Sequence, residues 1–224
     1  MLAVAPSAPP PAPAAAFAPS PRPPVNCGAC LIAAGEDVLW GRAIDVRRAN
    51  ASTTKMVTAL VVARETRLDE LVRASRNAAA TGGGGLDLRP GDVFTAGELL
   101  YALLLSSSND AAVALAEHVA GSERAFAARM NRVAESVGAT DSSFVTAHGL
   151  DVPGHYSTAR DLARIALAVL RRPALAEIVA TPSKTISGGR TLVNTNPLLE
   201  SYEGAVGVKT GYTAGAGDVL VAAA

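Results

Sequence analysis

The sequence has few aromatic residues, no excess of positive charge and no long hydrophobic run. Aromatic residues make up 4% of its 224 residues, and 20 Lys and Arg balance 20 Asp and Glu. Binding to nucleic acid usually needs a basic surface or aromatic side chains on which bases stack, so we expect no nucleic-acid partner. A membrane-spanning helix needs roughly 20 consecutive, mostly apolar residues. The sequence has no such run, so we expect no transmembrane segment in this chain.

Cysteine is also scarce, since the chain has only Cys27 and Cys30, in a Cys-Gly-Ala-Cys string. A structural metal site would need further ligands. A thioredoxin-like redox motif would need an adjoining β-α-β unit, which the sequence does not indicate. The pair is therefore either incidental or a small disulfide at the start of the first strand, and it predicts no metal centre.

The remaining composition is that of a globular domain preceded by a different N-terminal segment. Hydrophobic residues make up 49% and charged residues 18% of the chain, enough for one domain or two small lobes. Residues 1–25 are rich in Pro and Ala, and prolines interrupt the apolar stretch that a secretory signal requires. We interpret them as a leader or linker, or as a degraded or mis-started signal of an exported protein. The folded domain is expected over residues 26–224.

The pattern of apolar residues predicts strands at both ends of this domain and helices between them. Thr158 and Asp161 form a predicted capping box, the pattern returns to strands after Pro173, and Gly188-Gly189 is typical of a two-residue hairpin turn. The expected helices are 52–65, 96–105, 111–119, 126–137 and 158–169. The expected strands are 30–34, 38–41, 184–187, 190–193, 206–211 and 219–223. This order indicates an α+β fold with an antiparallel sheet lobe, a helical lobe and a cleft between them.

A Ser-x-x-Lys string at Ser52 and Lys55 could supply a nucleophile and its base. Residues three apart lie on one face of a helix, and the positive end of a helix favours an alkoxide. A lysine acts as a base only when it is neutral. Burial and a second cation nearby both lower its pKa, and Lys209 could be that cation. In isolation, such a string more often marks a helix-start serine followed by a surface lysine.

Two further polar strings accompany the first. Ser107 and Asn109 lie in the break between two apolar helices, where Ser107 could pass a proton and the Asn109 amide could hold a backbone group of a substrate. Lys209–Gly211 lies on a strand, where a cation beside a hydroxyl suits a terminal carboxylate and glycine allows a ligand to approach closely. The structural alternatives are a plain polar connector and an exposed turn.

Together and in this order, the three strings match those of the penicillin-binding, serine-acylating enzymes. The chain resembles the D-alanyl-D-alanine carboxypeptidases, which are the low-molecular-mass penicillin-binding proteins of bacterial cell-wall maturation. The similarity extends over residues 28–224 and implies the β-lactamase/penicillin-binding transpeptidase-like fold. The strings that carry it are ASTTKMVTAL (51–60), LRPGD (88–92), LLSSSNDAA (104–112), HGLD (148–151), GHYSTARDLA (154–163), NTNPLL (194–199) and GVKTGYT (207–213).

This resemblance implies a role for each site residue. The implied catalytic residues are Ser52, Lys55, Ser107 and Asn109. The implied substrate-binding residues are Lys209, Thr210, Gly211 and Tyr212. Ser52 would be the acylated nucleophile and Lys55 its base, the backbone N–H groups of Ser52 and Tyr212 would form the oxyanion hole, and His148 would order the cleft. The implied reaction removes the terminal D-alanine of peptidoglycan stem peptides through an acyl-serine, without metal or cofactor, and β-lactams would inhibit it.

The sequence departs from the family at two places. Gly82–Gly85 stands where relatives carry a Gly-Ser type of stretch, so we expect a looser loop near the cleft. In the family, another strand and a C-terminal helix follow the strand that matches 219–223, and that strand lies inside a five-stranded sheet. We therefore expect an incomplete catalytic domain with two unpaired strand edges.

Two other functions compete with the carboxypeptidase. The first is an inactive fragment or a non-catalytic cell-wall or penicillin-binding protein of the same fold. The second is a class A β-lactamase, which would also need a carboxylate in a Glu-x-x-x-Asn loop to activate the deacylating water. No such string lies between Asn109 and Lys209, which argues against the β-lactamase.

Overall fold

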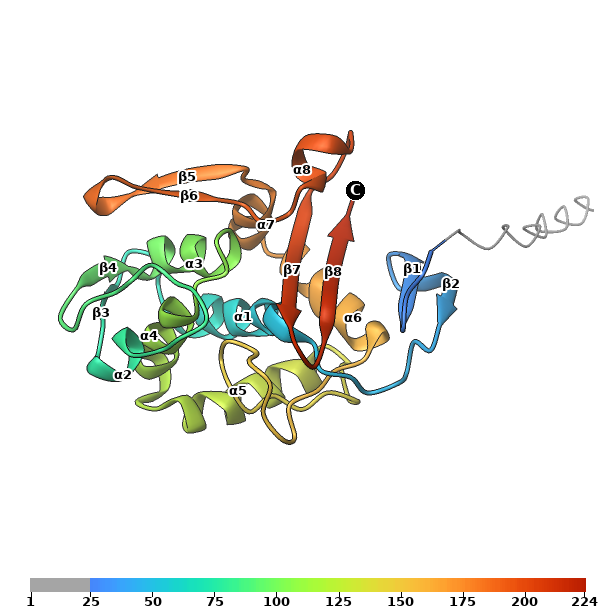
Figure 1. The fold of residues 1–224 in the computed structure, drawn as a ribbon, viewed down its shortest axis with the longest axis horizontal. Helices are drawn as coiled ribbons and strands as arrows, with labels where there is room; N and C mark the ends of the chain where they lie inside the picture. The colour runs from blue at the N-terminus through green and yellow to red at the C-terminus, as the bar shows by residue number, and fades with distance from the viewer. Residues whose placement is uncertain (1–24) are drawn as a thin grey trace, which may run out of the picture.

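The computed structural model describes residues 25–224, so nearly all of the predicted leader at 1–25 lies outside the described residues. Helices form one body, and the strand pairs lie around it (Figure 1). The helices are α1 (Lys55–Glu65), α2 (Arg76–Ala79), α3 (Ala96–Leu104), α4 (Asn109–Ala120), α5 (Glu123–Ser136), α6 (Ala159–Leu170), α7 (Pro173–Ala180) and α8 (Leu198–Ser201), with 3₁₀ turns η1 (Ala51–Thr54) and η2 (Ser187–Gly189). The strands are β1 (Cys30–Ala34), β2 (Asp37–Arg42), β3 (Leu71–Arg73), β4 (Val93–Thr95), β5 (Ser183–Ile186), β6 (Arg190–Val193), β7 (Gly207–Thr213) and β8 (Gly217–Ala223).

Helix α1 is the centre of the fold. Every residue from Met56 to Val62 is fully buried, because helices α3, α4, α5 and α6 all pack around it. A helix that is covered on all sides has no polar face to expose, and the only polar side chain in this stretch is Thr58, whose hydroxyl donates to the backbone oxygen of Ala147. The central helix therefore gives Lys55, its first residue, a rigid support.

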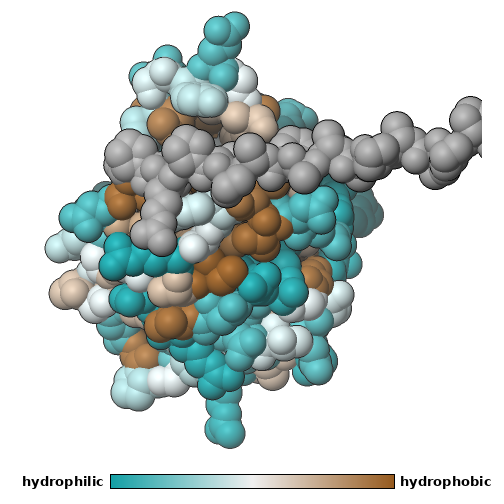
Figure 2. All heavy atoms as spheres, turned by 90° about the vertical axis from the view of Figure 1, so that its right-hand side faces the viewer, coloured by the Kyte–Doolittle hydropathy of each residue, from teal (hydrophilic) through white to brown (hydrophobic). Residues whose placement is uncertain are grey.

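The strands pair in twos. Within the described residues, β1 pairs only with β2 and β7 only with β8, both antiparallel. The two ribbons are separated by a groove of about 680 Å³ whose walls are β1, α6 and β8. Figure 2 views the side of the molecule that carries β1 and β2, and it shows hydrophobic residues gathered within a largely hydrophilic surface. This arrangement agrees with the expected pair of unpaired strand edges.

Most predicted elements are present, with three corrections. The segment after Pro173 forms helix α7 rather than a strand, with Pro173 in the first turn, where proline is favoured, and Leu175, Ile178 and Val179 buried at helical spacing. The β5–β6 connection has three residues, Ser187–Gly189, because Ile186 pairs with Arg190. Only half of the predicted capping box forms.

The hydroxyl of Thr158 accepts the backbone N–H of Asp161 at 3.1 Å and caps α6 as predicted. The Asp161 carboxylate does not return the bond to Thr158. It accepts instead from the Asp141 backbone N–H (2.7 Å) and the Ser142 hydroxyl (2.8 Å). Its role is therefore to fix the chain that precedes the 148–155 loop, which closes one side of the site.

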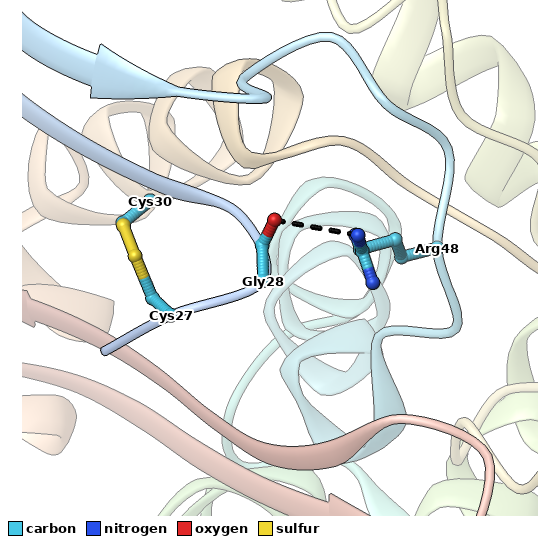
Figure 3. Close-up of a disulfide and its surroundings, with 4 residues drawn as sticks. All are labelled: Cys27, Gly28, Cys30 and Arg48. Atoms are coloured by element: carbon cyan, nitrogen blue, oxygen red, sulfur yellow. Dashed lines mark hydrogen bonds between the residues drawn. A yellow bond between two sulfur atoms is a disulfide. The ribbon is translucent and has the colours of Figure 1, made fainter.

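A disulfide joins Cys27 to Cys30, the first residue of β1 (Figure 3). The backbone oxygen of Gly28, inside the disulfide loop, accepts a hydrogen bond from the Arg48 guanidinium at 3.3 Å. The backbone of Arg48 also pairs with Ser157. The disulfide loop is thus tied to the segment that leads into Ser52. Among the helices of residues 25–224, none combines the length and the hydrophobicity of a membrane span.

Candidate active site

Ser52 lies in the 3₁₀ turn η1, directly before α1, rather than in the first turn of an α-helix as expected. The turn begins with Thr53 N–H donating to the Asn50 backbone oxygen. Because η1 continues into α1 without a break, Ser52 and Lys55 project from the same side. Nζ of Lys55 lies 2.8 Å from Oγ of Ser52.

Lys55 is completely buried. Besides Ser52, its Nζ lies 2.7 Å from Asn109 Oδ1 and 2.9 Å from the His148 backbone oxygen. Burial lowers the pKa of Lys55 well below its usual value, and the charge of Lys209 lowers it further, while Asp110 opposes the shift. A neutral amine has two N–H donors and one lone pair. In the neutral form the two carbonyl oxygens would take these donors, which would leave the lone pair for the hydroxyl of Ser52, as a general base requires.

The orientation of the Asn109 amide is fixed by the glycine loop, which consists of residues Gly82–Gly85. Its Nδ2 donates to the backbone oxygens of Gly82 (2.9 Å) and Gly83 (3.1 Å), so its Oδ1 must face Lys55. Both N–H groups are used within the protein, so the predicted contact of this amide with a substrate backbone group would have to use the second lone pair of Oδ1. The loop at Gly82–Gly85 is therefore held in place rather than loosened.

Asp110, which the sequence reasoning missed, also holds this loop in place. Its buried carboxylate accepts the backbone N–H groups of Leu86 (3.0 Å), Leu88 (3.1 Å) and Ala111 (2.8 Å). A Cβ at Gly85 would come within 2.4 Å of this carboxylate, so the loop can pass Asp110 only because Gly85 has no side chain. An acidic residue in the first turn of α4 was the available signal.

Ser107 lies between α3 and α4 with φ at +63°, a region that non-glycine residues rarely adopt. Its hydroxyl has no hydrogen-bond partner among the residues described, and in particular none with Ser52. The neighbouring serines are engaged instead, since the Ser106 and Ser108 hydroxyls lie 3.2 Å apart. Strained non-glycine positions of this kind cluster at functional sites.

Strand β7 places the third string against the nucleophile. Lys209 is 1% exposed, its Nζ donates to the Thr210 backbone oxygen at 3.0 Å, and burial lowers its pKa to about 7. The Thr210 hydroxyl lies 2.6 Å from that of Thr195. A Cβ at Gly211 would come within 2.9 Å of the Ser52 backbone nitrogen, so only glycine lets β7 lie this close to η1. The Tyr212 side chain is exposed.

Two buried histidines flank the site on the 148–155 segment. His148 presents its backbone oxygen to Lys55, while its Nδ1 accepts the Leu150 N–H at 3.1 Å. His155, which the sequence reasoning missed, accepts the Val145 N–H at Nδ1 (3.1 Å), and its Nε2 lies 2.8 Å from the Thr54 hydroxyl. Burial lowers the pKa of each to about 4, so both are neutral and structural. In the described part of the chain, no three His, Cys, Asp or Glu side chains gather as a metal ion would require.

Residues 25–224 match the model of the S11 peptidase family, described as D-alanyl-D-alanine carboxypeptidase. The Bacillus subtilis D-alanyl-D-alanine carboxypeptidase DacF is 37% identical over 84% of this chain and 50% of the relative. DacB2 of Mycobacterium tuberculosis is 41% identical over 84% of this chain and 66% of the relative. The crystal structure of Escherichia coli penicillin binding protein 6B superimposes with a TM-score of 0.81, at 34% identity, over 91% of this chain and 69% of that one.

These matches agree with the geometry of the site. The structure brings Ser52, Lys55 and Asn109 into direct contact and sets Lys209–Gly211 beside them. The chain spans about half the length of several of the curated relatives that it matches. Over that span it carries the fold and all three motifs. The chain belongs to the D-alanyl-D-alanine carboxypeptidase family.

Proposed function

We propose that this chain carries the catalytic site of a serine-type D-Ala-D-Ala carboxypeptidase that trims peptidoglycan stem peptides and is acylated by β-lactams. The observation that carries the proposal is the 2.8 Å contact between Ser52 Oγ and a buried Lys55 whose pKa is strongly lowered. A hydroxyl beside a neutral amine is an activated nucleophile.

In the acylation step, Lys55 Nζ takes the proton of Ser52 as Oγ attacks the carbonyl carbon of the penultimate D-alanine. The backbone N–H groups of Ser52 and Tyr212 stabilise the negative oxygen of the tetrahedral intermediate. The carbon–nitrogen bond then breaks, the leaving amine of the terminal D-alanine takes a proton from Lys55 by way of the Ser107 hydroxyl, and an ester on Ser52 remains. Ser107 suits this relay because its hydroxyl has no partner among the described residues.

In the deacylation step, water attacks the ester carbonyl while Lys55 accepts its proton. The stem peptide leaves with a new terminal carboxylate, and the proton returns to Ser52. In a β-lactam the cleaved amide is part of a ring, so the amine cannot diffuse away and the acyl-enzyme persists.

Recognition of the substrate carboxylate falls to Lys209 and Thr210. Lys209 is buried, with a pKa of about 7, so its ammonium form lacks the solvation that water would give it. A bound carboxylate supplies that missing partner through a charge-assisted hydrogen bond. Binding of the substrate and protonation of Lys209 are therefore coupled.

The proposed site of action is extracytoplasmic. We further propose that the protein is secreted and that it contributes to cell shape. Peptidoglycan lies outside the cytoplasmic membrane, and the Cys27–Cys30 disulfide fits an oxidising compartment.

The experiment is intact-protein mass spectrometry after incubation with benzylpenicillin, with Ser52→Ala as the control. We expect one penicillin adduct, absent from the control, and release of D-alanine from an N-acylated D-Ala-D-Ala peptide. No adduct on folded protein would contradict the proposal and favour a non-catalytic fragment. Fast penicillin turnover without release of D-alanine would favour a β-lactamase instead.

A further inference from the structure

The β7–β8 ribbon carries the proposed carboxylate-binding residues, but within the described residues it pairs with no third strand. A two-stranded ribbon is marginally stable by itself, so its position depends on side-chain contacts with the rest of the fold. One such contact lies at the start of β7, where the Asn196 amide donates to the Gly207 backbone oxygen at 2.9 Å.

The other end of the ribbon is held by Asp151. Its Oδ1 accepts the Thr213 hydroxyl at 2.8 Å, and its Oδ2 accepts the Gly215 backbone N–H at 2.9 Å. The Thr213 hydroxyl in turn accepts the Ala216 N–H at 3.1 Å. The carboxylate therefore ties together the last residue of β7 and the turn to β8.

Asp151 belongs to a short segment that is itself fixed against the nucleophile. Three residues earlier, the His148 backbone oxygen accepts from Lys55 Nζ. Between them, Gly149 has φ at +91°, and a Cβ there would come within 2.0 Å of the Ala51 backbone oxygen. Residues 148–151 cannot shift without disturbing either Lys55 or η1.

We propose that Asp151 is a positioning residue that holds strand β7 at its working distance from Ser52, an inference that rests on the proposed function. The segment 148–151 contacts the general base at one end and the carboxylate-binding strand at the other. This segment therefore sets the distance between Lys55 and strand β7.

A carboxylate suits this position for a chemical reason. Its two oxygens meet two donors, Thr213 O–H and Gly215 N–H. An asparagine would satisfy one donor and direct its own N–H₂ at the other, and alanine would satisfy neither. The lack of a side chain at Gly215 is part of the contact, because a Cβ there would lie 2.9 Å from Asp151 Oδ2.

The consequence for catalysis follows from the neighbours of Thr213. Tyr212, whose N–H is the proposed second oxyanion donor, precedes it directly. Releasing this end of the ribbon moves that donor away from Ser52, and a displacement near 1 Å can cost about a hundredfold in rate. The loss falls on the acylation step more than on the initial binding of a β-lactam.

The test measures the noncovalent dissociation constant and the acylation rate constant for benzylpenicillin separately, in the wild type and in Asp151→Ala, Asp151→Asn and Thr213→Val. Asp45→Ala is the matched control, because Asp45 is another exposed aspartate that accepts two N–H bonds, from Arg160. We expect Asp151→Ala to lower the acylation rate constant by about tenfold to a hundredfold, Asp151→Asn and Thr213→Val to lower it less, and the dissociation constant to change little.

In the double variant Asp151→Ala, Thr213→Val the loss should be smaller than the product of the two single losses, because both changes break the same Asp151–Thr213 hydrogen bond. An acylation rate constant within about twofold of wild type in Asp151→Ala overturns the proposal. If Asp151→Ala does not fold, Thr213→Val alone is decisive by the same criterion.

Amide hydrogen exchange separates this inference from the proposed function. We expect faster exchange over 207–217 in Asp151→Ala than in Asp45→Ala, whether or not the protein reacts with penicillin. Unchanged exchange there overturns the positioning role. A wild type that never forms an adduct, with faster exchange over 207–217 in Asp151→Ala, overturns the proposed function but supports the contact.

Discussion

Nζ of Lys55 lies 2.7 Å from Oδ1 of Asn109, and the same amide donates through Nδ2 to the backbone oxygens of Gly82 and Gly83. The amide therefore offers Lys55 an acceptor without a negative charge. A carboxylate at this point would favour the ammonium form of Lys55 and disable it as a base.

Asn109→Asp tests this relationship. We expect the acidic limb of the acylation pH profile to move to higher pH, because the new carboxylate raises the pKa of Lys55. On that limb the acylation rate should fall by about tenfold for each unit by which the pKa rises. The measurement is penicillin acylation from pH 5 to 10, with Asn109→Ala as the uncharged control. A profile of Asn109→Asp that coincides with that of Asn109→Ala would show that charge is not the cause.

Lys209 should make penicillin binding weaken above neutral pH. Burial holds its pKa at about 7 in the free protein, and only the ammonium form attracts the penicillin carboxylate. As pH rises through 7 the fraction of ammonium falls, so the dissociation constant should rise. The measurement is that constant from pH 5.5 to 9. Lys209→Arg should bind more weakly but lose this alkaline dependence, since arginine stays charged. The same alkaline dependence in the arginine variant would rule Lys209 out as its source.

His148 and His155 should make the fold acid-sensitive. Burial lowers the pKa of each to about 4, against about 6.5 in an unfolded chain. Between these values the unfolded state binds more protons, so the free energy of unfolding rises with pH. The contribution of these histidines to the free energy of unfolding should be fully present above pH 6.5 and should be lost as pH falls toward 4.

Thermal unfolding measured from pH 4 to 8 checks this expectation. His155→Asn should be less stable at neutral pH and show a flatter dependence, because one of the two groups is removed. The control is His118→Gln, which removes a surface histidine of α4 and leaves both buried histidines in place, so the loss of stability in acid should remain. A wild-type melting temperature that is constant from pH 7 to 4.5 would contradict the prediction.

Gly149→Ala should be far more damaging than Gly188→Ala. Both glycines have positive φ, +91° and +75°, so both substitutions incur backbone strain of about 1 kcal/mol. Only at Gly149 does the new Cβ meet another group, the Ala51 oxygen beside Ser52, while Gly188 has open space. We expect Gly149→Ala to lose penicillin acylation and several degrees of melting temperature, and Gly188→Ala to keep acylation. Equal losses in the two variants would show that strain, and not the contact with η1, decides the outcome.

The sequence predicted the long helices well because their apolar residues repeat at helical spacing over several turns, as at Leu162, Ile165 and Val169 of α6. It failed after Pro173, where eight residues are too few for the helical repeat to stand out from a short apolar strand. It also missed β3 and β4, which have three residues each and are recognisable only by their pairing.

The contacts within the site also divide into those that the local sequence could predict and those that it could not. Ser52 and Lys55 are three residues apart on one helical stretch, so local geometry alone brings them together, and the sequence could predict their contact. Asn109, Asp110, Asp151 and His155 act through partners 10 to 101 residues away. No local pattern encodes such distances.

By itself, the sequence determined the chemical groups and the helices and strands that present them, because both follow from residue type and short-range periodicity. Only the tertiary structure decided how those groups work. Packing buries Lys55 and lowers its pKa, the glycine loop turns the Asn109 oxygen toward it, and Asp151 ties β7 to the segment beside Ser52. Burial and hydrogen bonds between distant residues exist only once the chain has folded, and these interactions give an ordinary serine and an ordinary lysine their reactivity.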